Sequence, residues 1–235
     1  MRFRFAAVCL VVVGCVCCGT AAADDHSLVA WQTRQLSDLF FSEGADCGDF
    51  NGDGHMDVVS GPFWYAGPDF AKSHAYYEPK PFDPHGYSDN FFTFTDDFNG
   101  DGWTDILVYG FPGQDASWYE NPQGQDRLWP RYKVLDVVDN ESPNFADING
   151  DGRRDIVCSS EGYFGFAEVN REDPTAHWSF RRISDQSAGG RFTHGLGIGD
   201  VNGDGRMDIL EKSGWWEQPE SLEGDPQWKK HPFPF

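Results

Sequence analysis

A nine-residue pattern rich in aspartate and glycine recurs four times and holds the residues best suited to chemistry. Its form is Asp-x-Asn-Gly-Asp-Gly-x-x-Asp, with oxygen-bearing side chains at positions 1, 3, 5 and 9. The copies span residues 49–57, 97–105, 147–155 and 200–208. Carboxylate and amide oxygens alternating in so short a loop are typical of a calcium site, because Ca²⁺ takes roughly six to eight oxygen ligands.

Each loop supplies a nearly complete ligand set if the backbone carbonyl at position 7 also contributes. The glycine at position 6 permits the tight, positive-φ turn that brings alternate side chains inward. The predicted ligands of the first two loops are Asp49, Asn51, Asp53, His55 and Asp57, and Asp97, Asn99, Asp101, Trp103 and Asp105. Those of the other two are Asp147, Asn149, Asp151, Arg153 and Asp155, and Asp200, Asn202, Asp204, Arg206 and Asp208.

The loops have two alternative interpretations. An EF-hand needs flanking helices and a bidentate glutamate at position 12, where the four copies have Ser60, Val108, Cys158 and Glu211. Only the last fits, and apolar β-type residues surround it. Turns that bind nothing are the second alternative, but four copies with identical spacing favour metal binding.

We expect up to four Ca²⁺ ions with a structural role. Without metal, three carboxylates in one tight loop would repel one another and destabilise the turn. A cation that binds only the folded loop would raise the stability of the protein by linkage.

A second set of residues, Glu43, Asp89, Glu141 and His194, precedes the loops. Glu43, Glu141 and His194 each stand six residues before the first aspartate of their motif, and Asp89 stands eight before. If the residues between form inner strands, these side chains would surround the mouth of a central channel and could hold a second metal or do acid–base work. Solvated turn residues are the alternative. The sequence contains neither Gly-x-Ser-x-Gly nor His-Glu-x-x-His.

The loops belong to a longer repeat that must position them. A short apolar run follows each motif, an aromatic pair follows three of the four, and Trp129, Trp178 and Trp228 open a further strand. Trp31 matches this last element before the first motif. A period near 50 residues with about four short strands per unit predicts an all-β, propeller-like array of about four to five four-stranded blades, possibly incomplete. Its aromatic side chains would pack between blades.

On these motifs the chain resembles the FG-GAP/VCBS repeat family, which includes the propellers of integrin α-subunits, over about residues 28–235. The resemblance implies a β-propeller with calcium loops near the first and second strands of each blade. It also implies that Asp49, Asn51, Asp53, Asp57 and their counterparts bind the metal. Beyond the motif, Phe192–Asp200 and Gly214–Pro219 are similar to secreted bacterial members.

The first 23 residues resemble an export signal. Arg2 and Arg4 precede an apolar run that is too short to span a bilayer, and Ala21–Ala23 offers a cleavage site. Val12–Cys15 alternatively resembles a lipoprotein box that would place a lipid on Cys15. Both predict a secreted or periplasmic protein whose domain is residues 24–235. No later stretch is apolar and long enough to cross a membrane.

Two cysteines, Cys47 and Cys158, remain outside the expected signal. Cys47 and Cys158 are expected to be buried free thiols. A net charge of −20 argues against nucleic acid and anionic membranes as partners. We expect a binding module for an extracellular protein or glycan, with a secreted polysaccharide lyase or hydrolase as the alternative. We also expect further repeats or a domain beyond Phe235, or a ring completed by another subunit.

Overall fold

The computed structural model describes residues 33–235. The expected signal, the lipid attachment at Cys15 and the strand at Trp31 lie outside the described residues. The chain divides into two units, Met1–Arg34 and Gln35–Phe235, and every strand among the described residues belongs to the second. In the described part of the chain, no helix is long and apolar enough to cross a membrane.

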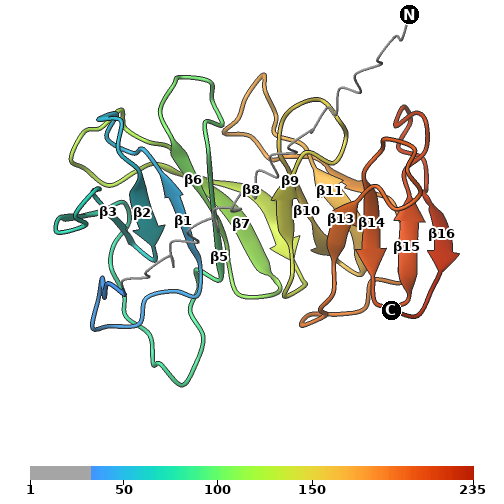
Figure 1. Cartoon of the computed structure of the whole chain (residues 1–235), viewed down its shortest axis with the longest axis horizontal. Coiled ribbons are helices and arrows are strands. Elements are labelled where there is room, and N and C mark those ends of the chain that lie inside the picture. The colour runs from blue at the N-terminus through green and yellow to red at the C-terminus, as the bar shows by residue number, and fades with distance from the viewer. Residues whose placement is uncertain (1–32) are drawn as a thin grey trace, which may run out of the picture. The chain divides into compact units, whose positions relative to one another are not determined.

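The second unit is built from four four-stranded antiparallel sheets that follow one another along the chain (Figure 1). Residues 33–235 contain no helix, so the all-β prediction with four strands per repeat is confirmed. The first sheet contains β1 (Ala45–Gly48), β2 (Asp57–Ser60), β3 (Phe63–Tyr65) and β4 (Ser73–Ala75). The second contains β5 (Phe92–Asp96), β6 (Asp105–Tyr109), β7 (Gln114–Tyr119) and β8 (Arg131–Val138). The third contains β9 (Asn144–Ala146), β10 (Asp155–Ser160), β11 (Tyr163–Ala167) and β12 (Phe180–Arg182), and the fourth β13 (Gly197–Gly199), β14 (Asp208–Glu211), β15 (Gly214–Glu217) and β16 (Lys229–Pro232).

The repeat maps onto each sheet in the same way. The aspartate-rich loop joins the first and second strands, the apolar run forms the second, and the aromatic element forms the third. Every residue of β6 and β10 is buried, because the two inner sheets are covered on both faces. Strand β2 of the first sheet alternates between buried and half-buried positions instead.

Three hydrophobic clusters join the sheets in chain order. The first and second sheets share a core that includes Phe50 and Ile106. The second and third share one around Phe98 and Ile156, and the third and fourth another that includes Ile209. Among the described residues no core cluster joins the fourth sheet to the first. Four sheets are therefore observed, whereas a fifth sheet and a closed ring are not found in this part of the chain.

Three tryptophans that precede the fourth strands fix neighbouring sheets together. The backbone N–H groups of Trp129, Trp178 and Trp228 donate to carbonyls of the preceding sheet, on Tyr76 (2.8 Å), Val134 (2.7 Å) and Ile183 (2.8 Å). All three indoles are buried. The expected packing role of this element is confirmed, because each ring lies in the core that its sheet shares with the preceding one.

The two described cysteines are both free, as expected. Cys158 is buried in β10, but Cys47 is exposed, so the prediction that both thiols are buried is wrong for Cys47. Cys47 lies on the first strand of the first sheet, where its side chain faces away from the shared core.

Candidate functional site: the four aspartate loops

The first aspartate of every motif organises its loop in the same way. In the first loop, Asp49 accepts the N–H of Gly52 on Oδ1 (2.7 Å) and that of Gly54 on Oδ2 (2.8 Å). Gly52 and Gly54 have φ of 72° and 84°, a backbone conformation that disfavours residues with a Cβ atom. Asp97, Asp147 and Asp200 make the same two bonds at 2.7–2.9 Å.

Positions 3 and 5 also turn their oxygens onto the loop backbone. The amide oxygen of Asn51 accepts the N–H of Asp53 (3.0 Å), and Asp53 in turn accepts the N–H of His55 (2.8 Å). The other three loops repeat both bonds. The bond from the position-7 N–H lowers the pKa of Asp53 and that of Asp204. These carboxylates therefore stay ionised in the folded loop.

The ninth-position aspartates lie deeper than the rest of the loop. Asp57, Asp105, Asp155 and Asp208 are at most 2% exposed. Asp57 accepts the N–H of Phe50 (2.9 Å) and that of Gly67 (2.8 Å), so it ties the loop to the end of β3. Burial raises the pKa of Asp105 and that of Asp155 to about 7. A nearby cation would stabilise the charged form of these carboxylates.

The donor set of the loops matches the ligand chemistry that calcium prefers. Every predicted side-chain ligand offers oxygen, as a hard cation prefers, and the oxygens at positions 1, 3 and 5 keep lone pairs beside their backbone bonds. The side chains of the described residues contain no group of three or more His, Cys, Asp or Glu poised to hold a metal ion. The residues thus fit calcium by chemistry, and calcium binding itself stays a prediction.

A glutamate from the third strand region reaches three of the loops, a contact that the sequence analysis missed. The carboxylates of Glu120, Glu168 and Glu217 accept from the motif asparagines Asn99 (3.2 Å), Asn149 (2.8 Å) and Asn202 (3.4 Å). Ala66 holds the equivalent place in the first repeat. The signal was present in the sequence, because each glutamate follows its aromatic element at a fixed position.

The loops lie where neighbouring sheets meet. The position-2 carbonyl of each of the first three loops accepts a hydrogen bond from a side chain of the following sheet. Asn121 Nδ2 donates to Phe50 O (2.9 Å), Arg171 Nη1 to Phe98 O (3.3 Å), and Gln218 Nε2 to Ile148 O (2.6 Å). A change in loop geometry would therefore affect the contact between sheets.

Of the four residues predicted at the channel mouth, Glu43, Asp89, Glu141 and His194, only the last two are in contact. His194 Nε2 lies 2.8 Å from Glu141 Oε2. Glu43 instead accepts the Ser88 hydroxyl (2.5 Å), and Asp89 lines a separate cavity with Lys80 and Arg131.

The cavity beside His194 is small, with a volume of about 60 Å³. Asn140 and Thr193 line it. Among the described residues, Asn140 Nδ2 and Thr193 Oγ1 are buried with no hydrogen-bond partner.

Residues 97–158 match a family described as FG-GAP-like repeat, which confirms the resemblance seen in the motifs. No curated protein matches the chain. Among solved structures, the chain is similar to one titled "Crystal structure of the V. cholerae biofilm matrix protein Bap1", with 16% sequence identity and a TM-score of 0.38. That match covers 80% of this chain and 31% of the other chain. This chain therefore spans about a third of the length of the solved structure that it matches.

Proposed function

We propose that this FG-GAP-like repeat chain is an extracellular binding module whose four aspartate loops bind structural Ca²⁺. The carrying observation is that all four loops share one hydrogen-bond pattern and present oxygen ligands with the same spacing. The export-like sequence of residues 1–23 supports an extracellular location, where free calcium is plentiful enough to fill sites with Kd of about 10⁻⁴–10⁻³ M.

The side chains at positions 1, 3, 5 and 9, with the position-7 carbonyl, would hold each ion. Bound Ca²⁺ would offset the repulsion among the loop carboxylates and keep the ninth-position aspartate ionised. Because the position-2 carbonyl of three loops binds the following sheet, calcium would stabilise the contact between sheets as well as the turn. The module would thereby keep a rigid surface for its ligand.

We further propose that each sheet is a propeller blade. Support comes from the repeated tryptophan contacts and from three shared cores in chain order. Further blades, beyond these residues or from another subunit, would complete the ring.

The proposed metal role is tested by thermal unfolding of the chain in saturating calcium and in chelator. We expect a higher melting temperature with calcium, and calorimetric titration should count up to four ions. Asp97→Asn should lower the count by one, whereas Asp83→Asn, in an exposed turn outside the motifs, should not. Identical melting curves with and without calcium would refute the proposal.

The enzyme alternative rests on the Glu141–His194 contact. A cavity of about 60 Å³ is far below the roughly 300–1,000 Å³ of typical ligand sites, and neither Glu43 nor Asp89 lines it. These observations favour the binding module. Turnover of a polysaccharide that is lost in His194→Ala would reverse this preference.

A further inference from the structure

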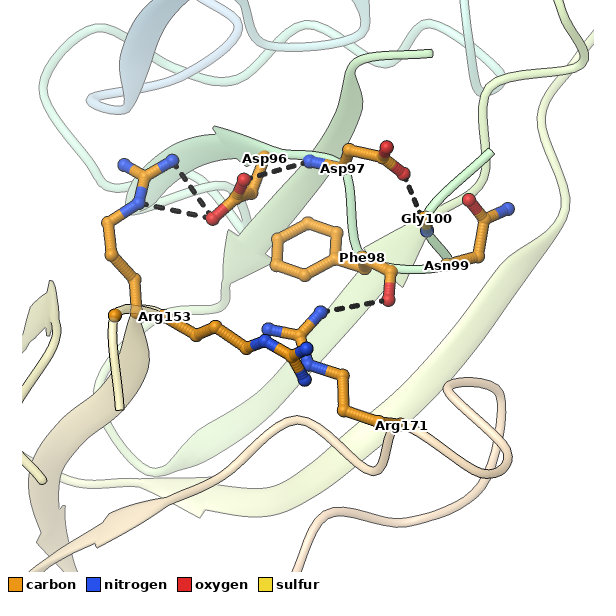
Figure 2. A pocket seen from close by; sticks show the side chains of 9 residues that line it. Asp96, Asp97, Phe98, Asn99, Gly100, Arg153 and Arg171 are labelled. Carbon is orange, nitrogen blue, oxygen red and sulfur yellow. Dashed lines mark hydrogen bonds and ion pairs between the residues drawn. The ribbon is translucent and has the colours of Figure 1, made fainter. Parts of the chain in front are cut away.

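A polar cavity of about 550 Å³ lies between the second and third aspartate loops (Figure 2). Its wall consists of residues 96–100 from the second sheet, residues 152–154 from the third loop, and Arg171. The volume falls in the range of roughly 300–1,000 Å³ that is usual for small-molecule sites. Asp97, Asn99 and the carbonyl of Arg153 are among the predicted calcium ligands, but the calcium proposal gives no role to the cavity or to the guanidinium groups that line it.

Three arginines face the cavity, although the chain carries a net charge of −20. Arg154 is already matched, because its Nη2 lies 3.1 Å from Asp96 Oδ2 and its guanidinium covers the Phe145 ring. Arg171 donates to the carbonyl of Phe98 and makes no ion pair with any described residue. In residues 33–235 the guanidinium of Arg153 has neither a hydrogen bond nor an ion pair.

The two unmatched guanidiniums converge. Figure 2 shows the side chain of Arg153 extending towards the guanidinium of Arg171, with the Phe98 carbonyl beside them. Converging like charges repel each other. Asp96, Asp151 and Asp155 offset part of this repulsion at Arg171, and an anion bound between the guanidiniums would offset more. Asp97 forms no ion pair with Arg153 or Arg171, and its carboxylate oxygens accept the N–H groups of Gly100 and Gly102 within its own loop.

The arrangement is specific to this pair of sheets. In the fourth loop Arg206 occupies the position of Arg153, but it pairs with Asp204 at 2.5 Å. At the other two sheet contacts, the neutral amides of Asn121 and Gln218 donate to the position-2 carbonyl, as Arg171 does here. An unmatched guanidinium pair is therefore not required to build the repeat.

We propose that this cavity binds the carboxylate of an acidic sugar, a uronate unit of an extracellular glycan. A planar guanidinium matches a carboxylate by two parallel hydrogen bonds, which favours Arg153 and Arg171 as the contact to the anionic group. Among the described residues, Phe98 is the one apolar side chain in the cavity wall, and such a largely polar wall suits hydroxyl groups better than an aliphatic body.

This inference deepens the proposed binding role by naming a ligand class and a site. Calcium in the adjoining loops would add positive charge beside the cavity and neutralise Asp97. We therefore expect calcium to strengthen uronate binding, and uronate to strengthen calcium binding by the same factor. The arginines alone should still give measurable binding in chelator.

Calorimetric titration of the full chain with trigalacturonate tests the proposal, with the neutral trisaccharide maltotriose as comparator. We expect saturable binding of trigalacturonate only. Arg153→Gln should weaken it by about tenfold or more, since charge-assisted hydrogen bonds are lost. Arg171→Lys, which keeps the charge but loses the planar group, should also weaken it.

Arg182→Gln is the matched control. It removes one positive charge from the same sheet, but Arg182 pairs with Glu161 outside the cavity. Equal affinity of the Arg153→Gln and Arg182→Gln proteins, or equal binding of maltotriose, would overturn the inference. Calcium-dependent melting without any trigalacturonate binding would refute the uronate site alone. Uronate binding lost in Arg153→Gln with no effect of calcium on melting would refute only the calcium proposal.

Discussion

Replacing Asn121 tests whether side-chain hydrogen bonds at the loops hold neighbouring sheets together. Its amide Nδ2 donates to Phe50 O and to Thr104 O, both at 2.9 Å, and its Oδ1 accepts the N–H of Gly124 (3.1 Å). The residue is only 1% exposed. Asn121→Ala would leave these backbone groups without their partner in a site that water reaches poorly.

We estimate the cost from the groups left unpaired. A buried polar group that loses its partner costs about 1–3 kcal/mol, and relaxation of the site offsets part of the sum. A total of about 2–4 kcal/mol is therefore expected for Asn121→Ala. Asn121→Asp should cost at least as much, because a carboxylate of the same shape cannot donate to the two carbonyls.

Urea unfolding at fixed saturating calcium measures both variants against Gln125→Ala. Gln125 is an exposed neighbour, so its replacement should change the free energy of unfolding by about 0.5 kcal/mol or less. A 3 kcal/mol loss corresponds to a melting temperature lower by about 6–12 °C in a chain of this size. If Asn121→Ala and Asn121→Asp both behave like Gln125→Ala, the inter-sheet hydrogen bonds do not contribute to stability and the reasoning is wrong.

Three further outcomes are expected. Trp178→Ala should lower the free energy of unfolding by about 3–5 kcal/mol, because the indole is fully buried in the core of the second and third sheets; a loss under 1 kcal/mol would contradict that packing. Burial opposes ionisation of Glu211, but bonds from Ser213 and Lys230 prevail and lower its pKa below the usual 4.5. Its stabilising contribution is therefore complete above about pH 4.5 and lost as the pH falls through the lowered pKa, so Glu211→Gln should destabilise the protein at neutral pH and converge with wild type in acid. In a chain that begins at Asp24, a thiol reagent should modify Cys47 rapidly and Cys158 only after unfolding, and equal rates for the two thiols would contradict the burial of Cys158.

Much of the fold was predictable because the repeat carries redundant local signals. The Gly52 and Gly54 positions of each motif require positive φ, which places a turn between two strands whatever the distant contacts are. The tryptophans at matching positions correctly predicted buried contacts between sheets. Ring closure was not predictable in this way, because it depends on contacts between the ends of the array and not on any repeating unit.

The candidate site was predictable in its composition and less so in its side-chain directions. The spacing predicts that Glu43, Asp89, Glu141 and His194 surround one channel mouth. In the structure Glu141 and His194 are in contact, whereas Glu43 accepts a hydrogen bond from Ser88. The spacing could not show that the ninth-position aspartates lie in the core. The Arg171–Phe98 contact joins residues 73 positions apart, and the other repeats use an amide and not a guanidinium at this place. The repeat pattern therefore did not predict it.

The hydrogen bonds to the position-2 carbonyls of the first three loops all run in one direction along the chain, from a later sheet to the loop of the sheet just before it. The acceptor carbonyls exist as soon as the earlier sheet has formed, whereas their donors arrive about 70 residues later. A newly made sheet thus finds its binding partner complete, and assembly can advance from the N-terminal side in steps of one repeat. Such vectorial folding avoids the slow search that a distant strand pairing would impose.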